Sequence, residues 1–193
     1  MKNELLNLLN NYLQIFPKEK ERQLNLLDFL NKTEDRDIID WNNFEGHIVA
    51  GGFIYAKKEN KFLVLYHKEL KMYLYPGGHV EYEDKTILDA AKREIKEETG
   101  LSNLEQLKID EDNLIPIDID THKIPFNNKR NLPEHYHFDF RYIFVIDKIG
   151  NIKIDTEESD NYQWIDLSEL KKDPNYEKVS KKIETLLKEE KKH

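Results

Sequence analysis

The sequence predicts an α+β fold in which helices pack against a mixed β-sheet. Three observations predict it. Apolar residues recur every three or four positions at both ends of the chain, which is the period of an amphipathic helix. Runs rich in Ile, Val, Phe and Tyr fill the middle and are separated by turn residues, which is typical of strands. One further helical segment interrupts these runs, so the order is helices, strands, helix, strands, helix and not a regular βαβ alternation.

The first 45 residues are expected to form a helical N-terminal extension. A first helical pattern covers residues 5–16 and ends at Pro17, since proline cannot continue a helix. A second pattern with the same period consists of three leucines, Leu24, Leu27 and Leu30. We expect the two helices to act as a lid or brace on a main domain of residues 46–193.

The main domain contains the expected strands, at residues 47–56, 61–67, 72–75, 114–124 and 136–146. Glu59 and Asn60 are expected to form a hairpin turn between the first two. A helix is expected over residues 86–99, because Thr86 with Asp89 three residues later is a capping pattern and Gly100 suits the other end. Trp164 is expected to open a last short segment, followed by an amphipathic helix at about 175–190.

Composition excludes several classes of protein. The 193 residues include no cysteine, so disulfides, thiolate catalysis and cysteine zinc sites are impossible. No apolar run approaches the roughly 20 residues that span a bilayer. Asn and Glu interrupt the first seven residues, so they lack the core of a signal peptide. We therefore expect a cytoplasmic protein with no membrane partner.

The net charge of −8 disfavours nucleic acid as a partner, because attraction to its phosphates needs a basic face. A phosphorylated small molecule can still bind to an acidic protein when metal ions bridge the two negative partners.

Three glutamates share one face of the expected helix over residues 86–99. Glu94 lies three residues before Glu97 and four before Glu98. Like charges at these spacings repel, at a cost of ~0.2–0.5 kcal/mol per pair on an open surface. A bound divalent cation removes the conflict, since Mg²⁺ prefers oxygen ligands. The alternative is a solvated acidic face, with charge offset by Arg93 and Lys96.

The segment around these glutamates resembles a known family. Gly77-Gly78-His79-Val80-Glu81, followed by Arg93-Glu94-Ile95-Lys96-Glu97-Glu98-Thr99-Gly100-Leu101, is similar to the Nudix box of the MutT-like hydrolases. The second half matches Arg-Glu-apolar-x-Glu-Glu-x-Gly-apolar at every fixed position. That match is far more specific than a lone glycine-rich loop. The resemblance implies a Nudix-type α/β/α sandwich.

The loop before the helix departs from the common box. A Glu is usual six residues after the second glycine and eight before the arginine. Here Asp84 is six residues after Gly78, whereas Lys85 is eight before Arg93, so the loop is one residue longer. Asp84 and Glu83 are the two candidates for the carboxylate that pairs with the arginine.

A wider resemblance points to one bacterial subgroup of Nudix hydrolases that has a helical N-terminal extension. Two segments carry it, residues 119–125 and residues 135–141. The similarity covers residues 46 to about 170 well and the N-terminal helices loosely.

The resemblance implies that water attacks a phosphorus of a diphosphate bridge joining a nucleoside to a second moiety. By position, Glu94, Glu97 and Glu98 would be carboxylate ligands of Mg²⁺ or Mn²⁺, with the Gly77 carbonyl as a backbone ligand. Arg93 would orient the glutamates through an ion pair. Many relatives recruit a downstream Glu as base or extra ligand, and Glu158 is the best match.

The downstream position has two alternatives. Glu157 is the second candidate for the role of Glu158. The other alternative is an ordinary solvated acidic loop over residues 155–158 with no functional role. The box also implies substrate contacts at Gly78 and His79, although His79 is equally compatible with a plain loop side chain.

A second set of polar residues alternates with apolar ones along two expected strands. One strand carries Asp118, Asp120 and His122, and the other carries His135, His137, Asp139 and Arg141. Each set would share one face of its strand. Three hypotheses stay open: a hydrogen-bonded network, a wall that binds substrate through His137, Asp139 and Arg141, and a second, transition-metal site.

The leading functional hypothesis is hydrolysis of a nucleoside diphosphate derivative. The alternative is a metabolite sensor that keeps the Nudix fold without turnover. Isopentenyl-diphosphate isomerases on this fold are expected to need a catalytic cysteine, which is missing here. Trimming of RNA 5′ ends is disfavoured by the charge. The sequence leaves open the substrate, the number of metal ions and the oligomeric state, a homodimer being one option.

Overall fold

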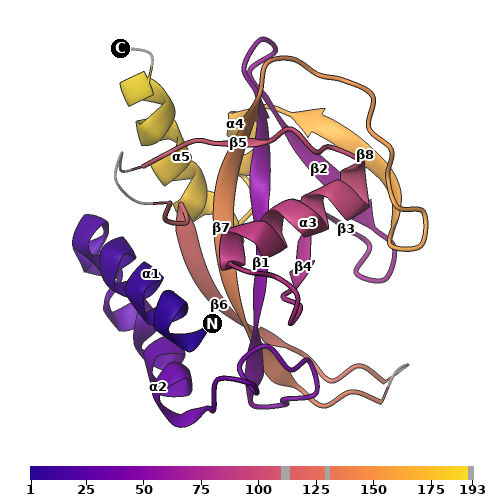
Figure 1. Cartoon of the computed structure of the whole chain (residues 1–193). Helices are drawn as coiled ribbons and strands as arrows, with labels where there is room; N and C mark the ends of the chain where they lie inside the picture. Colours follow the sequence, from indigo (N-terminus) through magenta and orange to yellow (C-terminus); the bar gives the residue numbers. More distant parts are fainter. Residues whose placement is uncertain (110–113, 129–130, 191–193) are drawn as a thin grey trace.

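The strands of the described residues form one mixed β-sheet. The computed structural model describes residues 1–109, 114–128 and 131–190 (Figure 1). Within these residues eight strands join, and they are β1 (Gly46–Ala56), β2 (Lys61–His67), β3 (Met72–Leu74), β4 (Gly77–His79), β5 (Glu105–Gln106), β6 (Asp118–Ile124), β7 (His135–Ile146) and β8 (Ser159–Ile165). The two longest strands, β1 and β7, run parallel at the centre, while the other pairs are antiparallel. The predicted mixed sheet is confirmed.

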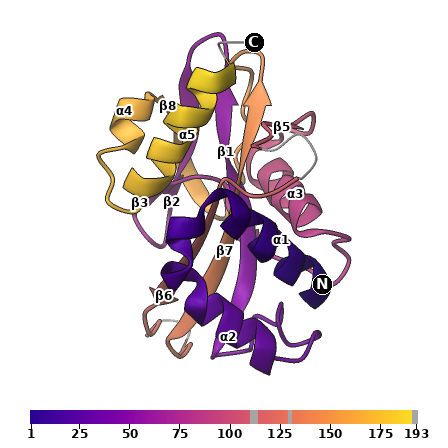
Figure 2. The same ribbon diagram turned by 90° about the vertical axis from the view of Figure 1, so that its left-hand side faces the viewer.

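Helices cover both faces of this sheet. They are α1 (Lys2–Ile15), α2 (Leu24–Lys32), α3 (Ile87–Thr99), α4 (Leu167–Leu170) and α5 (Glu177–Glu190), with two short 3-10 helices, η1 (Pro17–Glu19) and η2 (Glu21–Gln23). Successive residues of a strand point to opposite faces. Phe140 and Phe144 of β7 therefore pack with α3, whereas Ile143 packs with α5. Figure 2 shows the strands between these two helices. The arrangement confirms the expected sandwich.

The N-terminal helices share the core of the sheet. Leu5 and Leu9 of α1 belong to the same buried cluster as Ile48 and Phe138 from the central strands. The face of α2 differs from the prediction. Its buried residues are Leu26, Phe29 and Leu30, while Leu24 and Leu27 are exposed. The predicted set of leucines and the buried set both recur with the period of a helix. The buried set contains Phe29, whose ring stacks on that of Phe138 with ring centroids 4.6 Å apart, and this contact favours the buried set as the inward face.

The hairpin between β1 and β2 follows the prediction. Tyr55 pairs with Phe62 and Ala56 with Lys61, and Asn60 has the left-handed φ of 55° that asparagine tolerates in turns. The last segment does not follow it. Trp164 lies near the end of β8, which starts at Ser159. The first residues of this strand are polar and mostly exposed, so the hydropathy pattern does not indicate a strand there.

Helix α3 is capped at both ends as predicted. The Thr86 side chain accepts a hydrogen bond from the Asp89 N–H at 3.0 Å. Gly100 adopts a φ of 73°, and its N–H donates to the Lys96 carbonyl at 2.8 Å. The caps fix the helix phase, so that Ile87, Ala91 and Ile95 are buried. None of the helices in the described part of the chain has the length and apolarity needed to cross a membrane.

Candidate active site

Two glycines let the loop before α3 sit between β1 and the acidic helix. β4 pairs with β1, and a Cβ on Gly77 would lie 2.6 Å from the Gly51 Cα. A Cβ on Gly78 would lie 2.7 Å from Oε2 of Glu94. Both distances are far inside van der Waals contact. The glycines therefore allow the Glu94 carboxylate to lie directly against the backbone of β4.

Arg93 ties the loop to the helix. Its Nη2 donates to Oδ2 of Asp84 at 2.9 Å and to the His79 carbonyl at 2.7 Å, and its Nε donates to Oδ1 of Asp84 at 3.1 Å. A bidentate contact of this kind is the strongest geometry for an arginine and a carboxylate. Of the two candidate carboxylates, Asp84 pairs with the arginine, and Glu83 is exposed to solvent.

The three glutamates of the box lie on one side of α3 but have different partners. Nη1 of Arg93 donates to Glu94 at 2.9 Å and to Glu97 at 3.0 Å. Glu98 accepts a hydrogen bond from the Gly77 N–H at 2.9 Å. Glu98 is 9% exposed, whereas the Glu97 side chain is 56% exposed. The stripe therefore runs from a buried carboxylate beside β4 to one that faces solvent.

Burial gives two of these carboxylates unusual affinity for protons. It raises the pKa of Glu98 to about 8, with added repulsion from Glu158 and Glu94, while the Gly77 N–H acts in the opposite direction. Burial also raises the pKa of Glu94 to about 7, although Arg93 opposes it. Nearby positive charge therefore does not offset the burial of these two carboxylates.

The loop before β8 brings a further carboxylate to this place. The Asp155 N–H donates to the Glu98 carbonyl at 3.1 Å, so the loop packs on the end of α3. The charge of Glu158 acts on both Glu94 and Glu98. Glu157 is exposed, and its N–H donates to the Asp155 side chain at 2.8 Å. Glu158 is exposed as well, so its electrostatic effect on the two buried carboxylates, and not its burial, distinguishes it from Glu157.

The alternating polar residues of β6 and β7 face one another, because Asp118 pairs with Arg141, Asp120 with Asp139 and His122 with His137. One end of this face is an ion-pair network. Asp118 accepts from Arg22 at 2.9 Å, from Lys182 at 2.7 Å and from Arg141 at 3.4 Å. Arg22 belongs to η2 and Lys182 to α5, so Asp118 joins three parts of the chain.

The network also contains two residues that were predicted to contact substrate. Nε of Arg141 donates to Asp139 at 2.9 Å and to the Tyr75 hydroxyl at 3.0 Å, and its Nη2 donates to Asp120 at 2.8 Å. Arg141 and Asp139 are each 4% exposed. Both are held inside the protein by these ion pairs.

The other end of the same face is a cluster of histidines, and one member was missed in the sequence. His47, from the start of β1, has ring centroids 5.0 Å from His79, 5.0 Å from His135 and 4.7 Å from His137. Burial lowers the pKa of His47 to about 4 and that of His137 to about 2, with repulsion from neighbouring histidines. Only the pairing of β1 with β7 reveals the place of His47, and the sequence does not give that pairing.

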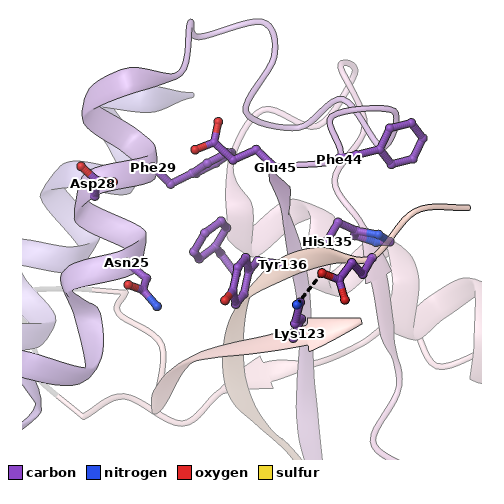
Figure 3. Close-up of a pocket in the computed structure, with 10 residues that line it drawn as sticks. Asn25, Asp28, Phe29, Phe44, Glu45, Lys123, His135 and Tyr136 are labelled. Atoms are coloured by element: carbon purple, nitrogen blue, oxygen red, sulfur yellow. Dashed lines mark hydrogen bonds and ion pairs between the residues drawn. The ribbon is translucent and has the colours of Figure 1, made fainter. Parts of the chain in front are cut away.

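A hollow of about 350 Å³ lies between α2 and the ends of β6 and β7 (Figure 3). Phe29 and Tyr136 lie on its wall, and an ion pair of 2.6 Å joins Lys123 to Glu134 beside it. His135 borders this hollow and also stacks on His47. The histidine cluster therefore lies next to an open space formed partly by α2.

Comparison with known proteins gives the context of this geometry. A model of the NUDIX domain matches residues 46–186. A curated relative from Lactococcus lactis subsp. cremoris, described as a probable DHNTP pyrophosphohydrolase, is 38% identical over 91 residues, which is 47% of this chain and 50% of the relative. The chain therefore spans about half the length of that relative.

Two solved structures share the fold. One is a hydrolase of the NUDIX family from Clostridium perfringens, with a TM-score of 0.52, 25% identity and coverage of 72% of this chain and 97% of that one. The other is the NUDIX domain of Shewanella oneidensis NrtR in complex with ADP ribose, with a TM-score of 0.51, 12% identity and coverage of 83% and 97%. The family model matches well over half of the chain and includes the acidic helix, so this protein belongs to the Nudix family.

Proposed function

We propose that this protein is a pyrophosphohydrolase that cleaves the diphosphate bridge of a nucleoside diphosphate linked to another moiety. The observation that carries the proposal is the buried carboxylate cluster at the Gly77–Gly78 loop. Glu94 and Glu98 are drawn into the protein beside Glu158 without enough positive charge to balance them. Family membership and the pyrophosphohydrolase name of the Lactococcus relative support the same reaction.

The residues of this cluster suit Mg²⁺ or Mn²⁺. Both ions prefer carboxylate and carbonyl oxygens. Glu94, Glu97 and Glu98 would hold the metal, together with the Gly77 carbonyl and Glu158. Gly78 leaves the Glu94 carboxylate room that any side chain would fill. When bound, the ion neutralises the diphosphate and lowers the pKa of water.

The side chains around the cluster have separate roles in proton transfer, positioning and substrate binding. Water attacks one phosphorus, its proton passes to the Glu158 carboxylate, and the bond from that phosphorus to the bridging oxygen breaks. Arg93 is a positioning residue, because Asp84 and the His79 carbonyl hold its guanidinium. We assign substrate contacts to Gly78, which lies against the Glu94 carboxylate, and to the exposed His79.

The remaining predicted substrate contacts receive different roles. We assign Asp139 and Arg141 to the ion-pair network, since both are buried and paired with each other. His137 belongs to the histidine cluster. The substrate itself is a phosphorylated nucleotide derivative, and its second moiety is to be identified by experiment.

We also propose that residues 1–45 brace the main domain of residues 46–193 and do not act as a lid. The apolar faces of α1 and α2 belong to the core cluster of the sheet. Arg22 adds ion pairs to Asp118 and Asp120 at 2.9 and 2.7 Å. A lid that opens would expose all of this apolar surface to water.

The test is a substrate panel with Mg²⁺, with Mn²⁺ and with a chelator. The panel includes nucleotide sugars, dinucleotides, nucleoside triphosphates and dihydroneopterin triphosphate, and product phosphates are measured by chromatography. We expect turnover of at least one compound and its loss with the chelator. Tight nucleotide binding without turnover on any compound would instead support the metabolite sensor, the second candidate, against which the complete set of box glutamates argues.

A further inference from the structure

The register of the sheet brings three histidines from three different strands to one place. His47 of β1 is the direct partner of His137 on β7. His79 of β4 is the partner of Val49, which lies two residues beyond His47 on β1. Residues two apart on a strand share a face, so the three imidazoles lie on the same side of the sheet. One ring nitrogen of each lies within 4.8 Å of the others.

The ring nitrogens of His47 lack a well-formed hydrogen bond within the described part of the chain. The residue is 1% exposed, and neither of its ring nitrogens makes a hydrogen bond of ordinary geometry with any residue that the structure describes. The backbone of Asn43 favours the charged form of His47, but burial and the neighbouring His79 and His135 outweigh it and lower the pKa. A buried polar group left without a partner costs about 1–3 kcal/mol. A ligand that binds a ring nitrogen would remove this cost.

A chain of hydrogen bonds indicates which nitrogen of His137 carries the hydrogen. Nδ1 of His135 lies 2.9 Å from the Pro133 carbonyl, which can only accept, so this nitrogen carries the hydrogen. In neutral His135, Nε2 is then an acceptor, and Nε2 of His137 donates to it at 3.3 Å. A neutral His137 keeps its lone pair on Nδ1. Ligand histidines in metal sites commonly donate their other N–H in this way.

We propose that His47, His79 and His137 form a binding site for one divalent transition-metal ion of the Zn²⁺ class. Imidazole ligands suit Zn²⁺, whereas Mg²⁺ prefers oxygen. Three histidines with a fourth position left open is a common arrangement for zinc. His79 is exposed, so solvent reaches the site on the side of this residue. Zn–N bonds are about 2.0–2.1 Å, so the imidazoles must draw together on binding, and the exposed ring of His79 can turn most easily.

The site is distinct from the acidic cluster on α3, and it does not rest on the proposed hydrolysis. It uses nitrogen ligands from the sheet, whereas the acidic cluster uses oxygens from a helix and a loop. The two sites touch through Arg93, whose Nη2 donates to the His79 carbonyl at 2.7 Å. An ion on the histidines would link β4 to β1 and β7, and β4 carries Gly77 and Gly78.

The experiment uses the full chain after treatment with a chelator and dialysis. Zn²⁺ is titrated by calorimetry in the presence of excess Mg²⁺, which occupies oxygen sites. Co²⁺ is titrated in parallel, because nitrogen ligation in a tetrahedral site gives an intense visible band. We expect one equivalent to bind to the wild-type protein. We expect His79→Gln and His137→Gln each to weaken binding at least ~100-fold, since each removes a ligand.

Two variants serve as controls. His122→Gln removes a histidine whose ring centroid is only 5.6 Å from that of His137 but whose Nδ1 is paired with Asp120. Glu98→Gln removes a carboxylate of the other site. Both should bind Zn²⁺ within twofold of wild type, with circular dichroism showing that all variants are folded. Failure of the folded wild type to take up one equivalent would overturn the proposal, as would full affinity in His79→Gln.

Discussion

Two groups of buried carboxylates in the described residues differ in the cations that surround them. Asp118 is 1% exposed and contacts Arg22, Arg141 and Lys182. Glu98 is 9% exposed, and a backbone N–H is its hydrogen-bond donor. Burial pushes both pKa values up, but in Asp118 the cations outweigh it and lower the pKa to about 2. In Glu98 the pKa rises to about 8.

The difference separates a structural role from a functional one. Where the chain supplies its own cations, the carboxylates hold distant segments together. At Glu98 the hydrogen-bond donor is a backbone N–H and Arg93 pairs with Glu94 and Glu97 instead, so further positive charge has to come from solution, as a metal ion or a proton. A desolvated carboxylate with too few counter-charges is a common mark of a functional site. The comparison therefore predicts different results when a carboxylate is removed from each group.

Glu98→Gln should have the largest effect, and it should act on activity alone. The amide keeps the shape of the side chain but removes the charge that holds a metal ion, so kcat should fall at least ~100-fold. Without metal the free energy of unfolding should not fall, since Gln keeps the shape of the side chain and can still accept the Gly77 N–H, while it removes a carboxyl whose charged form burial disfavours. Steady-state assays and urea unfolding measure the two quantities.

The matched control is Glu157→Gln, on an exposed neighbour in the loop before β8. It should change kcat by less than twofold. Unchanged activity in Glu98→Gln would place the reaction elsewhere in the molecule.

Asp118→Asn should act on stability. It leaves Arg22, Arg141 and Lys182 with fewer negative partners in a buried place, and breaking such a network typically costs about 3 kcal/mol. Urea unfolding at pH 7 gives the change. Asp28→Asn, which breaks the exposed pair with Lys32, is the control and should cost at most about 0.5 kcal/mol. Equal losses in the two variants would contradict the role of the network.

The acidic helix was predictable because its geometry is local. Spacings of three and four residues place Glu94, Glu97 and Glu98 on one side of any α-helix. The capping residues Thr86 and Gly100 are likewise read from neighbours in the chain. Within such a segment the backbone alone fixes the relative positions of the side chains.

Contacts between distant parts of the chain were not predictable. Arg22 lies 96 residues from Asp118, and no local pattern joins them. His47 faces His137 only because β1 and β7 are parallel and in that register. The choice of Asp84 over Glu83 depends on the path of the loop in space. In each case the partner is set by the packing of the whole domain.

The smallest effect concerns pH, and it tests the same network with the native side chain. The pKa of Asp118 is lowered from its ordinary value of 3.8 to about 2, because the hydrogen bond of Arg22 and the neighbouring positive charges outweigh burial. A carboxylate with a lowered pKa stabilises the folded state above its unfolded pKa, and this stabilisation is lost as pH falls through the folded pKa. The contribution is about 2 kcal/mol.

The stability difference between wild type and Asp118→Asn should therefore shrink by about 2 kcal/mol as pH falls from about 4 to about 2. Urea unfolding at a series of pH values measures it, and the difference between variants cancels the titration of carboxylates outside the network. Asp28→Asn should show no such trend, because its pair is exposed. If the difference in the free energy of unfolding stayed constant down to pH 2, Asp118 would stabilise the fold through packing and not through its charge. Asp118 and Glu98 would then differ in burial alone.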